Sequence, residues 1–122
     1  MAKIIAGKIK SIELGNLSAK RDWGFSGDYV EAMHLIMNYK KADDYVVATG
    51  KTYSIRQFIK ITCGMLGIKP VFEGKGLNEI CYDKKNGKKI IIIDKKYFRT
   101  QDVHRLKGNS YKIKTAPSRL QS

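Results

Sequence analysis

Four consecutive isoleucines at positions 90–93 constrain the fold of this 122-residue chain more than any other feature. Asn86-Gly87, a hairpin signal, comes just before them, so residues 89–94 are predicted to form a strand. An unbroken apolar strand is typical of a strand covered on both faces or lying under a helix. A chain with room for one domain buries only about two-thirds of its unfolded surface. We therefore expect a missing partner domain to supply part of the cover.

A helix is predicted after Ser54, because Ser54 and Gln57 have the spacing of a capping box. Apolar residues at helical spacing follow it. Gly67 suits the left-handed position after a helix, and Pro70 prevents the helix from resuming.

A second helix is expected to begin at an N-cap formed by Ser26 or Asp28. Its apolar face would consist of Tyr29, Val30, Met33, Ile36 and Met37. The remaining elements are expected as strands at residues 11–14, 45–48 and 71–73, and as the end of a helix within residues 1–10. This order predicts an α/β or α+β fold.

Basic residues outnumber acidic ones by 24 to 11, which gives a net charge of +13. Such an excess attracts nucleic acid, acidic membranes or phosphorylated small molecules. Lysine pairs beside turn-like residues are also typical of ordinary solvated surface. A nucleic-acid-binding module needs a basic face interleaved with exposed aromatic residues. The predicted helices have apolar faces and scattered basic residues, so this module is an alternative and we expect no nucleic-acid partner.

The two cysteines, Cys63 and Cys81, lie among apolar residues without CxxC spacing, so free thiols in a reducing compartment and no metal site are expected. The basic start lacks the continuous apolar stretch of a secretory signal. No run approaches the roughly 20 apolar residues of a membrane span. These features predict a cytoplasmic protein without a membrane partner.

The run GNLSAKRDWG at residues 15–24 gathers basic residues and an indole before the second predicted helix. Helix N-termini attract anions, and arginine binds phosphate oxygens in bidentate fashion. Arg21 is therefore interpreted as part of a phosphate-facing turn, with Asp22 either orienting it or capping the turn. The alternative is an Arg21–Asp22 pair that ties a loop to the core.

A second cluster spans residues 97–102, where Arg99 and Asp102 are three residues apart and would share a face of a helical turn. An arginine there suits a phosphate, and a carboxylate suits ribose hydroxyls. A surface salt bridge within one turn is the alternative.

The run at residues 15–24 resembles the GDP-mannose 4,6-dehydratase family, which reads G-N-L-D-A-K-R-D-W-G there. Similarity covers roughly residues 2–110. Further matching segments are DYVEAM at 28–33, DYVVATG at 44–50, EGKG at 73–76 and YFR at 97–99. The resemblance implies an α/β fold, the C-terminal part of an extended short-chain dehydrogenase of Rossmann type without its N-terminal cofactor-binding half. Residues 1–114 would form a partial nucleotide-sugar-binding domain, and residues 115–122 a divergent, loose tail, as a truncated reading frame would produce.

The resemblance also implies the site residues. Arg21 and Arg99 would contact the diphosphate and the GDP moiety, and Asp102 would replace the family's ribose-binding glutamate. Lys8 falls where a lysine near the guanine-ribose end is expected. Asn16, in the most specific matching run, completes the predicted substrate-binding set.

The resemblance places the family's catalytic threonine and glutamate, its Tyr-x-x-x-Lys pair and its cofactor turn upstream of what would be Met1. Within the chain, no tyrosine is followed by lysine four residues later. No catalytic residue is assigned, and NADP, the family's cofactor, is not expected to bind this chain alone. The implied function is binding of GDP-mannose for the lyase reaction that yields GDP-4-dehydro-6-deoxy-D-mannose, on the route to deoxysugars such as GDP-fucose. The chain alone would be inactive, with a cofactor-binding half or a second copy as partner. A repurposed, non-catalytic nucleotide-sugar-binding protein is the further alternative.

Overall fold

A computed structural model of the chain describes residues 1–115. These residues form two compact units that interleave along the chain: residues 1–19 with 54–104, and residues 20–53 with the segment from 105 onward. The sequence suggested one partial domain over residues 1–114 and gave no sign of this interleaving. Of the predicted tail, residues 116–122 lie outside the described residues. Within residues 1–115, no helix is long and apolar enough to cross a membrane.

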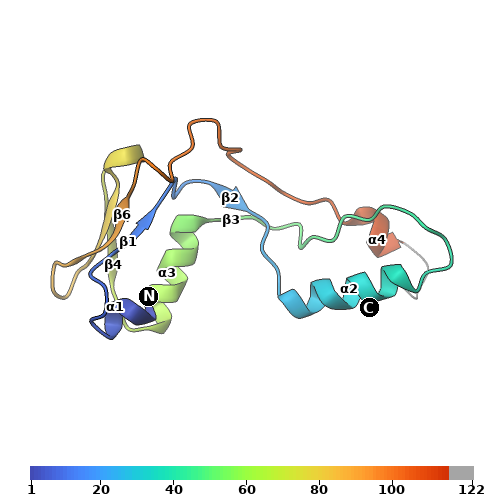
Figure 1. Cartoon of the computed structure of the whole chain (residues 1–122), viewed down its shortest axis with the longest axis horizontal. Coiled ribbons are helices and arrows are strands. Elements are labelled where there is room, and N and C mark those ends of the chain that lie inside the picture. The colour runs from blue at the N-terminus through green and yellow to red at the C-terminus, as the bar shows by residue number, and fades with distance from the viewer. Residues whose placement is uncertain (116–122) are drawn as a thin grey trace. The chain divides into compact units, whose positions relative to one another are not determined.

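The first unit is built on a four-stranded mixed sheet with the strand order β1-β6-β5-β4 (Figure 1). Its strands are β1 (Ile12–Leu14), β4 (Pro70–Glu73), β5 (Ile80–Asp83) and β6 (Lys89–Ile93). The pair β1–β6 is parallel, and the other two pairs are antiparallel. The fold is therefore α/β in content, with the isoleucine strand at an interior position of the sheet.

The first two isoleucines of the strand are buried as predicted, and Ile92 and Ile93 are partly buried. Ile90 and Ile91 are 3% and 1% exposed, and because neighbouring residues of a strand point to opposite faces, both faces of β6 are covered here. Ile59 and Cys63 of helix α3 (Ile55–Met65) belong to the same core cluster. Both cysteines are buried free thiols, as expected. The chain thus supplies cover for the first half of β6 from its own residues.

The predicted hairpin before the isoleucines is confirmed, because β5 and β6 pair in antiparallel fashion around residues 84–88. Gly87 adopts a φ of 67°, which a residue without Cβ accepts readily. Strand β5 was not expected from the sequence, since the short stretch Ile-Cys-Tyr-Asp offers little β-branched signal.

Helix α3 begins and ends where the sequence predicted. The Gln57 N–H donates to Ser54 Oγ at 3.1 Å, and the Ser54 N–H donates to Gln57 Oε1 at 2.7 Å, which completes the capping box. Leu66 is the C-cap, and Gly67 has a φ of 69°. The shorter helix α1 (Ala2–Ile5) accounts for the predicted N-terminal helix.

In the second unit, helix α2 (Ser26–Met37) departs from its predicted cap and face. Phe25 is the N-cap position and no side chain caps the helix, so the assignment to Ser26 or Asp28 is wrong. Ile36 packs in the cluster around Ile113 of helix α4 (Tyr111–Thr115). Three residues of the predicted apolar face, Val30, Met33 and Met37, are exposed instead. The helix therefore buries a face rotated from the predicted one, through Ala32, Leu35 and Ile36.

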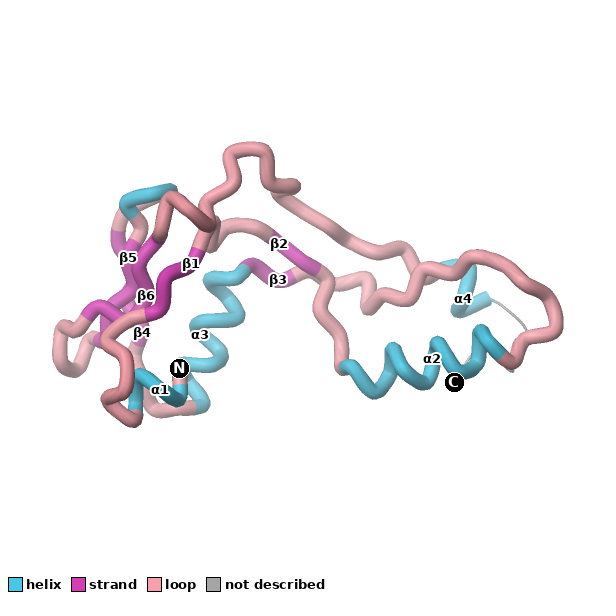
Figure 2. Tube along the Cα trace, viewed as in Figure 1, coloured by secondary structure: helices cyan, strands magenta, loops and turns pink. Residues whose placement is uncertain are grey.

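Much of the second unit lacks regular structure (Figure 2). The strand expected at residues 45–48 is absent; Tyr45 and Val47 instead pack beside Ile113 without a strand partner. Two short strands, β2 (Lys20–Arg21) and β3 (Tyr53–Ser54), form a two-stranded sheet. The first unit also contains the single 3₁₀ turn η1 (Gly76–Asn78) among the described residues.

Candidate functional site

Two of the predicted clusters begin just after strands of the first unit that end at the same edge of its sheet. β1 and β6 run parallel with Leu14 opposite Ile93, and their carboxyl ends lead into residues 15–16 and 94–102. The Asp94 N–H donates to the Leu14 carbonyl at 2.9 Å, which holds the two exits together. In open α/β sheets, ligands bind outside the carboxyl ends of the strands. This edge is the candidate site.

Gly15 allows the two exits to approach closely. A Cβ built on Gly15 would overlap the carbonyl oxygen of Tyr97, so any larger residue would push the two segments apart. Asn16 follows directly, and its Oδ1 accepts a hydrogen bond from the Ser18 N–H at 3.0 Å. Among residues 1–115 the amide NH₂ of Asn16 has no hydrogen-bond partner, which leaves two donors at this edge.

Arg99 and Asp102 belong to one turn after β6. The Asp102 N–H donates to the Arg99 carbonyl at 3.3 Å, and this segment is a turn without helix. The Arg99 side chain is exposed, and Asp102 is half-buried. An exposed cation and a half-buried carboxylate thus occupy the same edge as Asn16.

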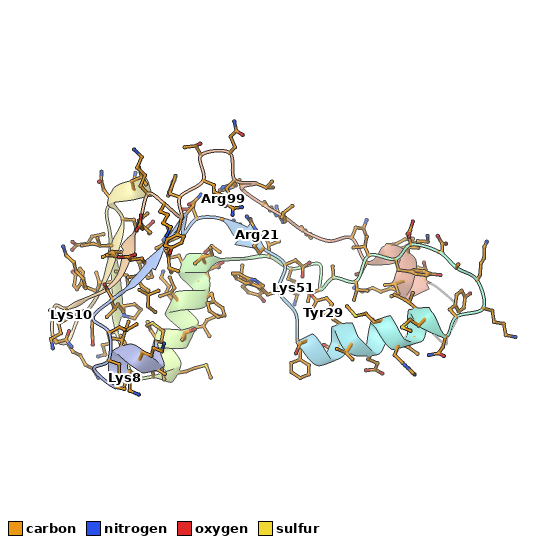
Figure 3. All side chains as sticks on the ribbon, in the orientation of Figure 1. Lys8, Lys10, Arg21, Tyr29, Lys51 and Arg99 are labelled. Atoms are coloured by element: carbon orange, nitrogen blue, oxygen red, sulfur yellow. The ribbon has the colours of Figure 1, made fainter. Side chains whose placement is uncertain are left out.

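Lys8 lies elsewhere. It precedes β1, together with Lys10, and therefore stands at the amino end of the strand, opposite the end that leads to Arg99 (Figure 3). The first unit brings the segments of Asn16, Arg99 and Asp102 together, and it does not bring Lys8 to them.

Arg21 belongs to the second unit, on β2. Its Nη1 donates to the Lys20 carbonyl at 2.8 Å. The residue is half-buried and lines a cavity of about 380 Å³ with Asp22, Tyr29 and Lys107, among others. Two cations, one carboxylate and a phenol line this cavity beside apolar residues, so the cations exceed the acid by one charge.

Asp22 binds the turn at Thr49 and Gly50, whereas the sequence suggested that it orients Arg21 or caps its own turn. Its carboxylate accepts from the Thr49 hydroxyl at 2.5 Å, from the Thr49 N–H at 3.0 Å and from the Gly50 N–H at 2.9 Å. The Thr49 hydroxyl, followed by these backbone donors, lowers the pKa of Asp22 below its usual value of 3.8, although burial opposes the shift. Asp22 therefore joins the segment at residues 21–24 to the segment at residues 48–50.

Sequence reasoning missed Arg56 and Glu79. The Arg56 guanidinium binds the Glu79 carboxylate with N–O distances of 2.7 and 2.8 Å, and also Ser18 Oγ at 3.0 Å. No sequence signal identified the pair, because the two residues are 23 positions apart and neither lies in a motif with a known spacing.

The described residues do not fit a dinucleotide. β1 leads through Gly15 into a loop and then β2, and the glycine-rich turn after β4 leads only into the single 3₁₀ turn η1. Across residues 1–115 no strand passes through a glycine-rich turn into an α-helix, the unit that binds a pyrophosphate at a helix N-terminus. The same residues contain no group of three or more histidine, cysteine or acidic side chains placed to hold a metal ion.

Comparison with known proteins gives consistent matches along nearly the whole chain. A sequence profile described as "GDP-mannose 4,6 dehydratase" matches residues 1–116. The human GDP-mannose 4,6 dehydratase is 42% identical over 114 residues, which cover 93% of this chain and 31% of the relative. The Dictyostelium discoideum protein of that name is 41% identical, covering 93% and 32%. The Vibrio cholerae protein is 38% identical, covering 93% and 33%. The chain therefore spans 31–33% of the length of these curated relatives.

Proposed function

Because the chain belongs to the GDP-mannose 4,6-dehydratase family, we propose that it binds GDP-mannose. The observation that carries the proposal is the edge where β1 and β6 end, since Gly15 lets the Asn16 loop approach the segment that leads to Arg99 and Asp102. The ligand is a nucleoside diphosphate joined to a sugar, so it presents a negative charge, ribose hydroxyls and ring hydroxyls. The side chains at this edge match those groups in kind.

Three residues at this edge of the first unit, Arg99, Asp102 and Asn16, each have a proposed role in binding the ligand. The Arg99 guanidinium donates to a diphosphate oxygen in a charge-assisted hydrogen bond, the stronger kind. The Asp102 carboxylate accepts from ribose hydroxyls, because an ionised carboxylate is an acceptor only. The amide NH₂ of Asn16 donates to a ligand oxygen while its Oδ1 stays with the Ser18 N–H.

Two further residues are proposed mainly from the resemblance. Arg21 is a diphosphate contact, and its position on a cavity with Lys107 supports a role in anion binding. Lys8 remains a prediction for the guanine-ribose end, and its position at the amino end of β1 gives this role no support.

We propose that the chain alone does not convert its ligand. The dehydratase reaction oxidises mannose at C4, eliminates water across C5 and C6 and returns the hydride at C6, giving GDP-4-dehydro-6-deoxy-D-mannose. Such hydride transfer requires a nicotinamide cofactor and a positioned base. NADP and the base would belong to a cofactor-binding half, and a second copy of this chain is the other candidate partner. The proposed setting is the cytoplasm.

Two alternative functions can be told apart from this proposal by experiment. A repurposed, non-catalytic protein would use the same residues and bind GDP-mannose without any cofactor half. A nucleic-acid-binding module would show affinity that falls steeply with salt, since neutralising phosphates releases counterions.

Isothermal titration with GDP-mannose tests the proposal, with Arg99→Ala as the site variant and Lys96→Ala as a matched control in the same segment. Loss of a hydrogen bond to a charged group costs about 1.5–3 kcal/mol, so Arg99→Ala should weaken binding by roughly 10- to 150-fold. Lys96→Ala should bind as the wild type does. Absence of binding by the wild type, or equal loss in both variants, would contradict the proposal.

A further inference from the structure

Arg56 joins three segments of the first unit that are distant in sequence. It lies in the first turn of α3. Its Nε and Nη2 donate to the two oxygens of Glu79, which follows η1, and Nη2 also donates to Ser18 Oγ in the loop after β1. One guanidinium therefore connects a helix, a turn and the loop that carries Asn16.

The Arg56–Glu79 pair has a fixed geometry. The Glu79 side chain is 5% exposed, and a carboxylate so deeply buried requires a charged partner with hydrogen bonds. The bidentate contact fixes the plane of the guanidinium, and the Phe72 ring centroid lies 5.9 Å from Arg56 Cζ. With its orientation set by Glu79, the guanidinium presents Nη2 to Ser18.

The loop after β1 is held from the same side by the backbone. The Arg56 N–H donates to the Leu17 carbonyl at 3.0 Å, and the Ile55 N–H donates to the Ala19 carbonyl at 3.2 Å. Ser18 in turn donates its N–H to Asn16 Oδ1. A continuous series of hydrogen bonds thus runs from Glu79 through Arg56 and Ser18 to the side chain of Asn16.

The geometry points to Arg56 as a positioning residue that fixes Asn16 for binding of the nucleotide sugar, an inference that rests on the proposed function. Glu79 holds the guanidinium, the guanidinium holds the Ser18 hydroxyl, and the Ser18 N–H turns the Asn16 side chain so that its NH₂ is left for a ligand. Arg56 itself does not touch the ligand in this scheme.

The most informative variant is Ser18→Ala, because it removes the link to the loop and leaves the buried Arg56–Glu79 pair intact. Ser18→Thr keeps a hydroxyl and serves as the rescue. Thr62→Ala is the matched control, since the Thr62 hydroxyl donates to the Phe58 carbonyl within α3 and does not contact the loop. Amide hydrogen exchange and GDP-mannose titration are measured on all four proteins.

In Ser18→Ala, the backbone amide of residue 18 should exchange its hydrogen about tenfold faster than in the wild type, because the loop has lost a hydrogen bond to a charged donor. For the same reason this variant should bind GDP-mannose about tenfold more weakly. Ser18→Thr and Thr62→Ala should match the wild type in both measurements. Unchanged exchange in Ser18→Ala, or unchanged affinity where the wild type binds, would overturn the inference. If the wild type does not bind, the proposed function fails, and the exchange data alone then decide whether Arg56 orders the loop.

Discussion

Gly15 is the residue on which the candidate edge depends most directly. It has no positive φ, and its importance comes from the missing Cβ, which allows the Tyr97 carbonyl to approach. Forced overlap in a packed site typically costs about 1–3 kcal/mol.

Gly15→Ala should therefore lower the free energy of unfolding of the first unit by about that amount, measured by urea denaturation. Gly64→Ala is the matched control, because Gly64 lies within α3 with open space around its Cβ position. That replacement should stabilise the protein by about 0.5–1 kcal/mol. Similar effects of the two replacements would contradict the close approach at Gly15.

Asp22 links stability of the second unit to pH. A group whose pKa is lower in the folded than in the unfolded state contributes stability above its unfolded pKa, and this contribution is lost as the pH falls through the folded value. The pKa of Asp22 is lowered, with the Thr49 hydroxyl as the largest cause, so its contribution disappears below the ordinary value of 3.8.

Asp22→Asn should accordingly reduce the loss of stability between pH 6 and pH 3. The free energy of unfolding at each pH is measured by urea denaturation, followed by the fluorescence of Trp23, the single tryptophan of the chain, which lies in the second unit. Asp43 also has a lowered pKa, caused chiefly by Lys112, so part of the pH dependence should remain. Equal pH dependence in the wild type and Asp22→Asn would count against this role of Asp22.

At the scale of elements, α3 and α2 begin differently although serine stands at the start of both. Ser54 is a true N-cap, while Ser26 is the first helical residue and caps nothing. Ser54→Ala should therefore destabilise the protein by about 1 kcal/mol. Ser26→Ala should change the free energy of unfolding by less than about 0.5 kcal/mol. Thermal unfolding of the pair checks this, and equal losses would contradict the assigned caps.

The exposed apolar side chains of α2 form the second element-scale feature. Val30, Met33 and Met37 are 64%, 60% and 83% exposed, and at spacings of three and four they share one side of the helix. Such a face matches the proposal of a partner half or a second copy.

Met33→Lys tests this face. A surface replacement should leave the free energy of unfolding within about 0.5 kcal/mol of the wild type, while self-association, followed by sedimentation velocity, should fall. Glu31→Gln, on another side of α2, raises the net charge by the same one unit and serves as the control. A large loss of stability in Met33→Lys would show that Met33 is packed inside the unit.

For the whole molecule, the sequence predicted best those features that depend on neighbouring residues. The capping box at Ser54, the hairpin at Gly87 and the buried isoleucines are local signals, and the structure confirms them. The strand at residues 45–48 failed because a strand requires a hydrogen-bonding partner, which local composition does not specify.

The candidate site shows the same division. Arg99 and Asp102 lie in one turn, but it is not the helical turn that their spacing suggested, and their meeting with the Asn16 loop depends on the parallel pairing of β1 and β6. That pairing joins residues about 80 positions apart, a contact that no local pattern encodes. The Arg56–Glu79 pair and the interleaving of the two units were out of reach of sequence reasoning for the same reason.

Whether this chain binds GDP-mannose can be measured by a thermal melt of the purified protein with and without millimolar GDP-mannose. A ligand that binds only the native state adds about 2.7 kcal/mol at a hundredfold excess over its dissociation constant. We expect a cooperative melt that shifts upward with GDP-mannose, and a shift that Arg21→Ala and Arg99→Ala each abolish. A cooperative melt that GDP-mannose leaves unchanged would contradict the proposed binding.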